Sequence, residues 1–268
     1  FTGKWGKGKL RVKDIKNSFN HWSEMLHGKG WNLIYWHNHD HPRIVSHYGD
    51  DGMYRVVSAK MLAIALYFMP GTSITYQGEE IGMTNVLYND ISCFRDVEVF
   101  TEYRNFLERG AKVEDALQTL RDRSRDNSRS PIQWDDTEYS GFSKVKPWMD
   151  VNYNYKDINV KADDANPDSI LNTYRYILNH RLEDAENITC GDLEFIDIES
   201  QESFIYLNHG KNKVHLVVCN FTKEPIEADL SKQEIEGFEY FYSNLVSRPL
   251  SSKMTLEPYE ALVYVKIK

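Results

Sequence analysis

The hydrophobic and polar positions before residue 84 alternate between two kinds of pattern. Apolar residues recur at helical spacing over 15–26 and over 53–69, and glycine or proline ends both segments. A short apolar run bounded by turn residues follows each of them, at 31–36 and at 73–76. We expect both runs to be strands, with 31–36 buried on both faces. The repeated order of helix, strand and polar loop predicts an α/β fold with a parallel sheet.

The pattern changes twice in the rest of the chain. Residues 84–164 contain helical stretches but are rich in aromatic and turn residues, which is typical of an ordered excursion rather than of a linker. A further helix is predicted over 169–182. After Gly191, short runs of strand-forming residues separated by turn residues predict a small antiparallel β-domain. The predicted domains are therefore 1–190, which contains the excursion, and 191–268.

Composition and charge exclude several classes of protein. Of the 268 residues 41% are hydrophobic, enough for a folded core, and no apolar run approaches the ~18 residues of a membrane span. The net charge of −8 predicts neither a nucleic acid nor a membrane surface as partner, because both attract basic patches. The three cysteines lie far apart, which fits a reducing, cytoplasmic location and leaves no CxxC metal site.

The first candidate for chemistry is Asn38-His39-Asp40, directly after the predicted strand 31–36. Active sites of α/β folds lie at this end of the strands. The alternative, which spacing alone favours, is a turn capped by Asn and Asp with its histidines in solvent. Alternating histidines at 37, 39 and 41 could suggest a metal, but they point to one side only if the segment stays a strand, which Pro42 makes doubtful, so we assign no metal. His180, His209 and His215 stand alone and are expected to be surface or satisfied core residues.

Two further polar segments carry charged groups. Residues 124–135 interleave arginines with carboxylates and an aromatic residue, a combination that can bind a polyol through directional hydrogen bonds. Composition alone favours a salt-bridged loop instead. Glu79 and Glu80 follow the predicted strand 73–76, but adjacent side chains on an extended backbone point apart. We therefore expect this pair to supply a carboxylate that holds an arginine under the site, not the paired acids of a glycosidase.

Taken together, the blocks 38–46, 58–63, 76–85 and 124–135 resemble the α-amylase family of glycoside hydrolases, family 13. They are most similar to its oligo-1,6-glucosidase, dextran glucosidase and trehalose-6-phosphate hydrolase branch. The resemblance implies a (β/α)8 TIM barrel in which 31–36 and 73–76 are strands seven and eight and 168–183 is the last helix. It also implies that 191–268 form a β-sandwich domain. A whole barrel takes roughly 250 residues, so the chain is expected to contain only the carboxy-terminal part.

The resemblance also implies roles for individual residues. Asp40 matches the family's third catalytic carboxylate, whose bonds to sugar hydroxyls tighten in the transition state. His39 matches a histidine that binds the same sugar, and Arg125 matches an arginine that recognises the glucose at the non-reducing end. Asn38 and Arg43 match supporting residues. The family's nucleophile aspartate and acid/base glutamate have no match in this chain, so the chain is expected to be inactive alone.

The expected activity is that of a retaining α-glucosidase acting on the non-reducing ends of short α-glucans, such as isomalto-oligosaccharides and dextran, without a cofactor. A trehalose-6-phosphate hydrolase and a sucrose isomerase or other transglucosylase of the same family are alternatives. A carbohydrate-binding or interaction fragment is the non-enzymatic alternative. An open half-barrel would expose strand edges and apolar surface. We therefore expect self-association, with 31–36 covered by a second copy.

Overall fold

The computed structural model describes residues 4–6 and 11–268, and the chain divides into two compact units. The first, here called the loop unit, contains Trp36–His47 and Thr75–Asn172, together with residues 4–6. The second, here called the sheet unit, contains Arg11–Tyr35, Tyr48–Ile74 and Thr173–Lys268. Both units are assembled from segments that are far apart in the sequence.

The sheet unit begins with the helices and strands that the sequence pattern predicts. Helix α1 spans Val12–Leu26, α3 spans Arg55–Tyr67, and the short strands β1 (Leu33–Ile34) and β2 (Thr72–Ser73) pair in parallel. Ten consecutive residues of α3, from Ser58 onward, are buried. A helix that is buried on all sides needs apolar or paired residues around its whole circumference. The predicted parallel pairing of the two strands is confirmed.

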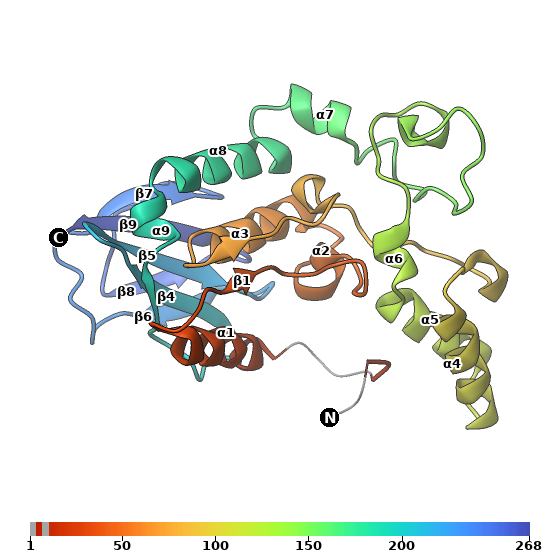
Figure 1. Cartoon of the computed structure of the whole chain (residues 1–268), viewed down its shortest axis with the longest axis horizontal. Helices are drawn as coiled ribbons and strands as arrows, with labels where there is room; N and C mark the ends of the chain where they lie inside the picture. Colours follow the sequence, from red (N-terminus) through yellow and green to blue (C-terminus); the bar gives the residue numbers. More distant parts are fainter. Residues whose placement is uncertain (1–3, 7–10) are drawn as a thin grey trace. The chain divides into compact units, whose positions relative to one another are not determined.

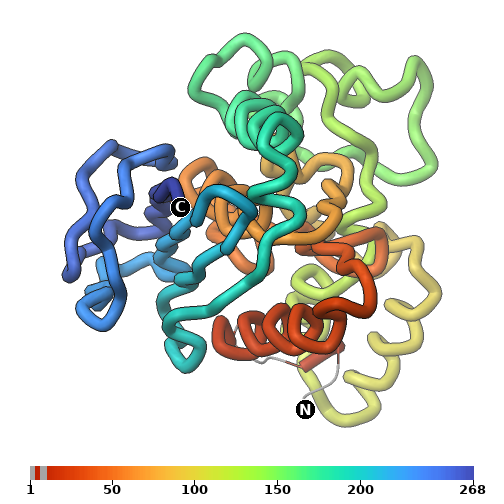
Figure 2. Tube along the Cα trace, turned by 60° about the vertical axis from the view of Figure 1, so that its left-hand side comes forward, coloured from red at the N-terminus to blue at the C-terminus, as the bar shows by residue number. Residues whose placement is uncertain are grey.

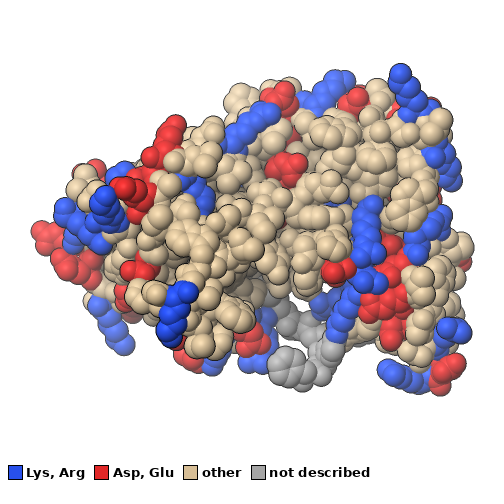
Figure 3. All heavy atoms as spheres, in the orientation of Figure 1, with Lys and Arg blue, Asp and Glu red and all other residues tan. Residues whose placement is uncertain are grey.

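The prediction that strand 31–36 is buried on both faces is wrong. Trp31, Leu33 and Tyr35 are 54%, 56% and 41% exposed, whereas Ile34 is 1% exposed. The alternation follows from strand geometry, since successive side chains point to opposite faces. Among the described residues β1 pairs only with β2. The exposures show that one face of the strand has no covering layer. The part of the surface over β1 carries few charged side chains in the view of Figure 3.

An antiparallel β-domain completes the sheet unit, as predicted. Its five-stranded sheet has the order β3-β4-β5-β9-β7, and β6 and β8 form a second, two-stranded sheet. Side chains of both sheets share one hydrophobic core, which includes Ile205, Leu216, Ile226, Leu256 and Leu262. The strands are β3 (Asp192–Phe195), β4 (Ser203–His209), β5 (Lys213–Asn220), β6 (Ile226–Asp229), β7 (Glu239–Ser243), β8 (Lys253–Leu256) and β9 (Ala261–Ile267).

Helices of the sheet unit cover the five-stranded sheet. Figure 1 shows α3 beside β5 and β9, and Figure 2 shows α1 beside the strands that follow α9 (Ala185–Ile188). Lys16 of α1 is fully buried, and its ammonium group donates to the carbonyl oxygens of Asp197 and Ser203. Burial lowers the pKa of Lys16 to about 8. Helix α8 (Ile170–Glu183) leads into α9, matching the helix predicted over 169–182.

The loop unit contains the whole predicted excursion, 84–164, which forms helices and two small apolar cores. Helices α4 and α5 pack over an apolar core that includes Val86, Phe94, Val99 and Leu120. A second small core joins Ile81, Met83, Ile132 and Leu171. The elements are α2 (Ile44–Tyr48, whose last residue belongs to the sheet unit), η1 (Glu79–Ile81), η2 (Ile91–Cys93), α4 (Val97–Glu108), α5 (Val113–Arg123), α6 (Asp126–Arg129), η3 (Glu138–Gly141) and α7 (Val160–Ala165).

Candidate active site

The loop of residues 37–43 presents two of the predicted site residues to solvent. The side-chain oxygen of Asn38 accepts the backbone N–H of Asp40 at 2.8 Å and lies 3.0 Å from Nδ1 of His41. These contacts hold a turn of the kind that asparagine favours. The side chains of His39 and Asp40 remain 65% and 49% exposed. The triplet is therefore a turn held by Asn38, and that turn leaves His39 and Asp40 accessible to a ligand.

Two arginines of the loop unit approach the Asp40 carboxylate. Nη2 of Arg129 donates to Oδ1 of Asp40 at 2.9 Å, and Nη1 of Arg125 lies 3.5 Å from the same oxygen. Nε2 of His39 is 3.5 Å from Oδ2. Desolvation alone would raise the pKa of Asp40, but the charges of His39, Arg125 and Arg129 outweigh it and lower the pKa. Asp40 is consequently ionised at neutral pH and can accept hydrogen bonds from hydroxyl groups.

Arg125 is fixed by a carboxylate that the sequence analysis missed. Its Nε and Nη2 donate to the two oxygens of Asp96 at 2.6 and 2.7 Å, a bidentate pair. Hydrogen bonding to Asp96 raises the pKa of Arg125. Asp96 is 6% exposed and caps α4 by accepting the N–H of Glu98. An aspartate directly before a helical stretch, here α4 from Val97, is the signal that could have identified it as a cap.

The position of Asp96 depends in turn on Asp126, which is 1% exposed. One oxygen of Asp126 accepts the backbone N–H groups of Arg95 and Asp96 at 2.7 and 3.2 Å. Asp126 is the first residue of α6 and directly follows Arg125. Its hydrogen bonds to the two N–H groups therefore connect the segment that carries Arg125 to the start of α4. The interleaved charges of 124–135 thus make a salt-bridged loop, as composition indicates, and this loop also brings Arg125 to Asp40. Figure 3 shows acidic and basic side chains gathered over α5 and α6.

Arg43 lies beneath the loop and is 1% exposed. Its guanidinium donates to the carbonyl oxygens of Asn127, Gln77 and Ser130 at 3.0, 2.6 and 3.5 Å. Its backbone N–H donates to Asn85 at 2.9 Å. Burial lowers the pKa of Arg43 to about 10, well above neutrality. Arg43 therefore joins three chain segments beneath the loop.

The acidic pair after β2 supports the site in a different way from the one predicted. The Glu79 carboxylate is fully buried, with one oxygen 3.2 Å from Nδ1 of His37, and Glu80 accepts the N–H of Gly78 at 2.7 Å. The charges of both glutamates counter the effect of burial on the pKa of Arg43. The hydrogen bonds given for the Arg43 guanidinium nevertheless go to carbonyl and hydroxyl oxygens. The glutamates therefore support Arg43 through their charge and not through these hydrogen bonds.

His47, just after this loop in α2, gives the loop unit a predicted pH dependence. Burial, reinforced by the charge of Arg123, lowers the pKa of His47 to about 4. Between about pH 4 and 6.5 the unfolded chain therefore binds a proton that the folded chain excludes, and stability is lost as the pH falls through this window. We expect His47→Asn to weaken this loss by at most about 3 kcal/mol. Denaturant unfolding of the wild-type and His47→Asn chains at several pH values measures this effect. Parallel pH profiles of the free energy of unfolding would contradict the prediction.

Comparison with known proteins identifies the family. The model of the alpha-amylase catalytic domain matches residues 2–191. The chain belongs to the α-amylase family of glycoside hydrolases, family 13. None of the helices in the described residues is both long and apolar enough to cross a membrane.

Three relatives are similar to this chain over nearly its whole length. An oligo-1,6-glucosidase of Bacillus cereus is 41% identical over 98% of the chain and 47% of the relative. The structure of a trehalose-6-phosphate hydrolase from Bacillus licheniformis is 41% identical, with a TM-score of 0.93, over 99% of the chain and 49% of that protein. An isomaltulose synthase from Erwinia rhapontici NX5 is 32% identical, with a TM-score of 0.88, over 98% and 48%. The chain spans about half the length of these relatives.

Proposed function

We propose that the chain is the carboxy-terminal part of a retaining α-glucosidase that acts on the non-reducing ends of short α-glucans, such as isomalto-oligosaccharides and dextran ends. The observation that carries this proposal is the accessible Asp40 carboxylate, paired with Arg129 at 2.9 Å and placed beside Arg125, which is itself fixed on Asp96. An ionised carboxylate next to guanidinium groups offers both acceptors and donors to the hydroxyls of one sugar ring.

In this proposal β1 and β2 belong to strands seven and eight of a (β/α)8 barrel, and α8 is its last helix. Residues 1–190, with the excursion 84–164, are the barrel part, and 191–268 are the carboxy-terminal domain. The match of the family model to residues 2–191 and the location of β3 to β9 after residue 191 support this division. The uncovered face of β1, with Trp31, Leu33 and Tyr35, is where the remaining barrel strands would pack.

Asp40 would accept hydrogen bonds from hydroxyls of the ring beside the scissile bond, and these bonds would strengthen as the oxocarbenium-like transition state forms. His39 would bind the same ring, and Arg125 would contact the glucose at the non-reducing end. Asn38 and Arg43 would hold the loop. A retaining mechanism further requires a nucleophile and an acid/base about 5–5.5 Å apart. Glu79 cannot serve, since its carboxylate is fully buried, so these two groups would come from the rest of the barrel.

The substrate is tested with a protein in which the chain is joined to the amino-terminal part of the barrel. Isomaltose, trehalose 6-phosphate and sucrose are offered separately, and the products are identified. Release of glucose from isomaltose supports the proposal. Preferential cleavage of trehalose 6-phosphate, or conversion of sucrose to an isomer, would replace it with one of the two alternative activities that relatives of this chain carry.

The uncovered face of β1 also predicts self-association of the chain alone. Exposed apolar side chains on one face of a strand are expected to be covered by a second copy. Sedimentation of the chain should show a dimer or larger species, and Leu33→Lys, which puts a charge on the exposed face, should shift it toward monomer. Val145→Lys is the matched control, because Val145 is 71% exposed and lies outside this face. A monomeric wild-type chain would contradict the expectation.

A cytoplasmic location is part of the same proposal. It rests on the cysteines, since Cys93, Cys190 and Cys219 are all free thiols.

The non-enzymatic alternative, a fragment that only binds carbohydrate, predicts glucoside binding by the chain alone. Glucoside binding by the chain, together with no hydrolysis by the barrel-completed protein, would favour that alternative.

A further inference from the structure

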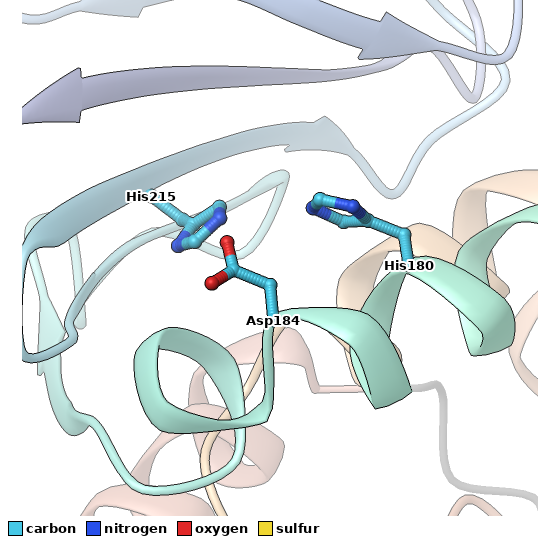
Figure 4. Close-up of side chains that lie close together, drawn as sticks. All are labelled: His180, Asp184 and His215. Carbon is cyan, nitrogen blue, oxygen red and sulfur yellow. The ribbon is translucent and has the colours of Figure 1, made fainter.

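Three side chains of the sheet unit converge at a place unrelated to Asp40. His180 comes from α8, Asp184 lies between α8 and α9, and His215 comes from β5. Figure 4 shows the three side chains pointing toward one another. One potential ligand atom of each lies within 4.8 Å of those of the other two. Among the histidine, cysteine and acidic side chains in the described part of the chain, these three lie close enough together to hold a metal ion.

The histidines of this cluster have unused nitrogen atoms, contrary to the expectation that they are satisfied core residues. His215 is 0% exposed, and neither of its ring nitrogens has a hydrogen-bond partner among the described residues. Nε2 of His180 is likewise buried and without a partner there. Buried polar atoms in native proteins are nearly always paired, so unpaired ones call for an explanation such as a missing ion. A metal ion would satisfy nitrogens of both rings at once.

The surroundings of the cluster suit metal coordination. The ring of Phe241 lies 4.4 Å from that of His180, and the ring of Phe68 lies 5.8 Å from that of His215. This apolar layer limits access of water and strengthens electrostatic interactions inside it. Asn187 donates to one oxygen of Asp184 at 2.6 Å, which orients the carboxylate as outer-layer contacts do in metal sites.

Burial lowers the pKa of His215 to about 4 and also lowers the pKa of His180. Both imidazoles are therefore neutral near pH 7, the form that coordinates a metal. For Asp184, burial would raise the pKa, but hydrogen bonds from Asn187 and Lys213 outweigh it and lower the pKa. Two neutral imidazoles and one carboxylate are thus available together at neutral pH.

We propose that His180, Asp184 and His215 form a binding site for one divalent metal ion of the zinc type. Imidazole nitrogen and carboxylate oxygen are ligands of Zn²⁺ at about 2.0–2.2 Å, and three protein ligands plus water complete a tetrahedron. Ligand atoms around such an ion are separated by roughly 3.3 Å, so small side-chain rotations would close the present spacing. Two histidine ligands favour zinc and its neighbours over Ca²⁺ and Mg²⁺, which prefer oxygen.

Lys213 competes for this site. Its Nζ donates to the second oxygen of Asp184 at 2.6 Å, so an ammonium ion now neutralises the carboxylate. The Lys213 side chain is 35% exposed and can turn to solvent when an ion enters. Removal of this charge should therefore strengthen metal binding, an effect that a merely structural cluster does not predict.

The test is calorimetric titration of the full 268-residue chain with Zn²⁺ alone, after treatment with a chelator. We expect one ion per chain at this site. His180→Gln and His215→Gln should each weaken its binding by roughly a hundredfold or more, since loss of outer-layer contacts already costs up to this much. Lys213→Met should tighten binding about tenfold or more, because it removes a neighbouring positive charge. His209→Gln is the matched control, because His209 pairs with Glu194 outside the cluster.

Visible absorption of bound Co²⁺ gives a second readout, since tetrahedral coordination produces a strong band that the histidine variants should lose. Should His215→Gln fail to fold, His180→Gln at its half-buried position and Lys213→Met still decide the matter. Binding that is unchanged in His180→Gln, or not tightened in Lys213→Met, overturns the proposal. So does a dissociation constant weaker than about 1 mM in both the wild-type and Lys213→Met chains.

Discussion

Replacing Asp40 by Asn is expected to lower kcat for an α-glucoside roughly a thousandfold in the protein that contains the whole barrel, with a smaller change in KM. The isosteric amide keeps the size of the side chain but loses the negative charge that faces Arg125 and Arg129. Contacts that tighten only in the transition state contribute to kcat rather than to substrate binding. Asp40 is 49% exposed, so the fold should tolerate the change.

Steady-state hydrolysis of p-nitrophenyl α-glucoside measures this effect. Asp136→Asn is the matched control, because Asp136 is an exposed aspartate of the loop unit that pairs with Lys161 at 2.9 Å. It should retain the wild-type kcat. Equal activities of the Asp40 variant and the control would show that Asp40 does not contact the reacting sugar.

Arg43→Met is expected to destabilise the protein by about 3–5 kcal/mol. The change leaves the carbonyl groups of Gln77, Asn127 and Ser130 without the guanidinium that now bridges them. Buried acceptors that lose their donors cost far more than exposed ones. Methionine fills part of the volume, so the loss is mainly electrostatic.

Denaturant unfolding of Arg43→Met beside Arg129→Met separates this support from the site itself. The Arg129 side chain is 31% exposed, so its loss should change the unfolding free energy by about 1 kcal/mol or less while impairing the Asp40 site. A large fall in stability for Arg129→Met with none for Arg43→Met would reverse the two roles assigned here.

The arrangement of the elements follows largely from local pattern. Helical periodicity over 15–26 and 53–69 predicts α1 and α3. The runs 31–36 and 73–76 indicate where two strands lie, but β1 (Leu33–Ile34) and β2 (Thr72–Ser73) are shorter, and β2 begins one residue before its predicted run. The burial of 31–36 could not be predicted in this way, because it depends on which layers cover the strand. Strands β6 and β8 alternate buried and exposed residues, but four residues are too few for this alternation to identify a strand.

The candidate site was only partly predictable. Arg125 and Asp40 are 85 positions apart, and residue spacing alone does not show that they meet; the resemblance to the family assigned both to the sugar site. Asp96 was missed because its role depends on a partner in another segment. His180 of α8 and His215 of β5 are far apart in the sequence and come together only in the folded sheet unit, so lone histidines in the sequence gave no sign of a cluster.

The most direct test of the account compares the hydrolysis of p-nitrophenyl α-glucoside and isomaltose by the chain alone and by the barrel-completed protein. The account predicts activity in the completed protein and none in the chain, since the buried Glu79 cannot replace the missing nucleophile and acid. Hydrolysis by the chain alone would contradict it and would mean that a carboxylate of this chain acts as the nucleophile.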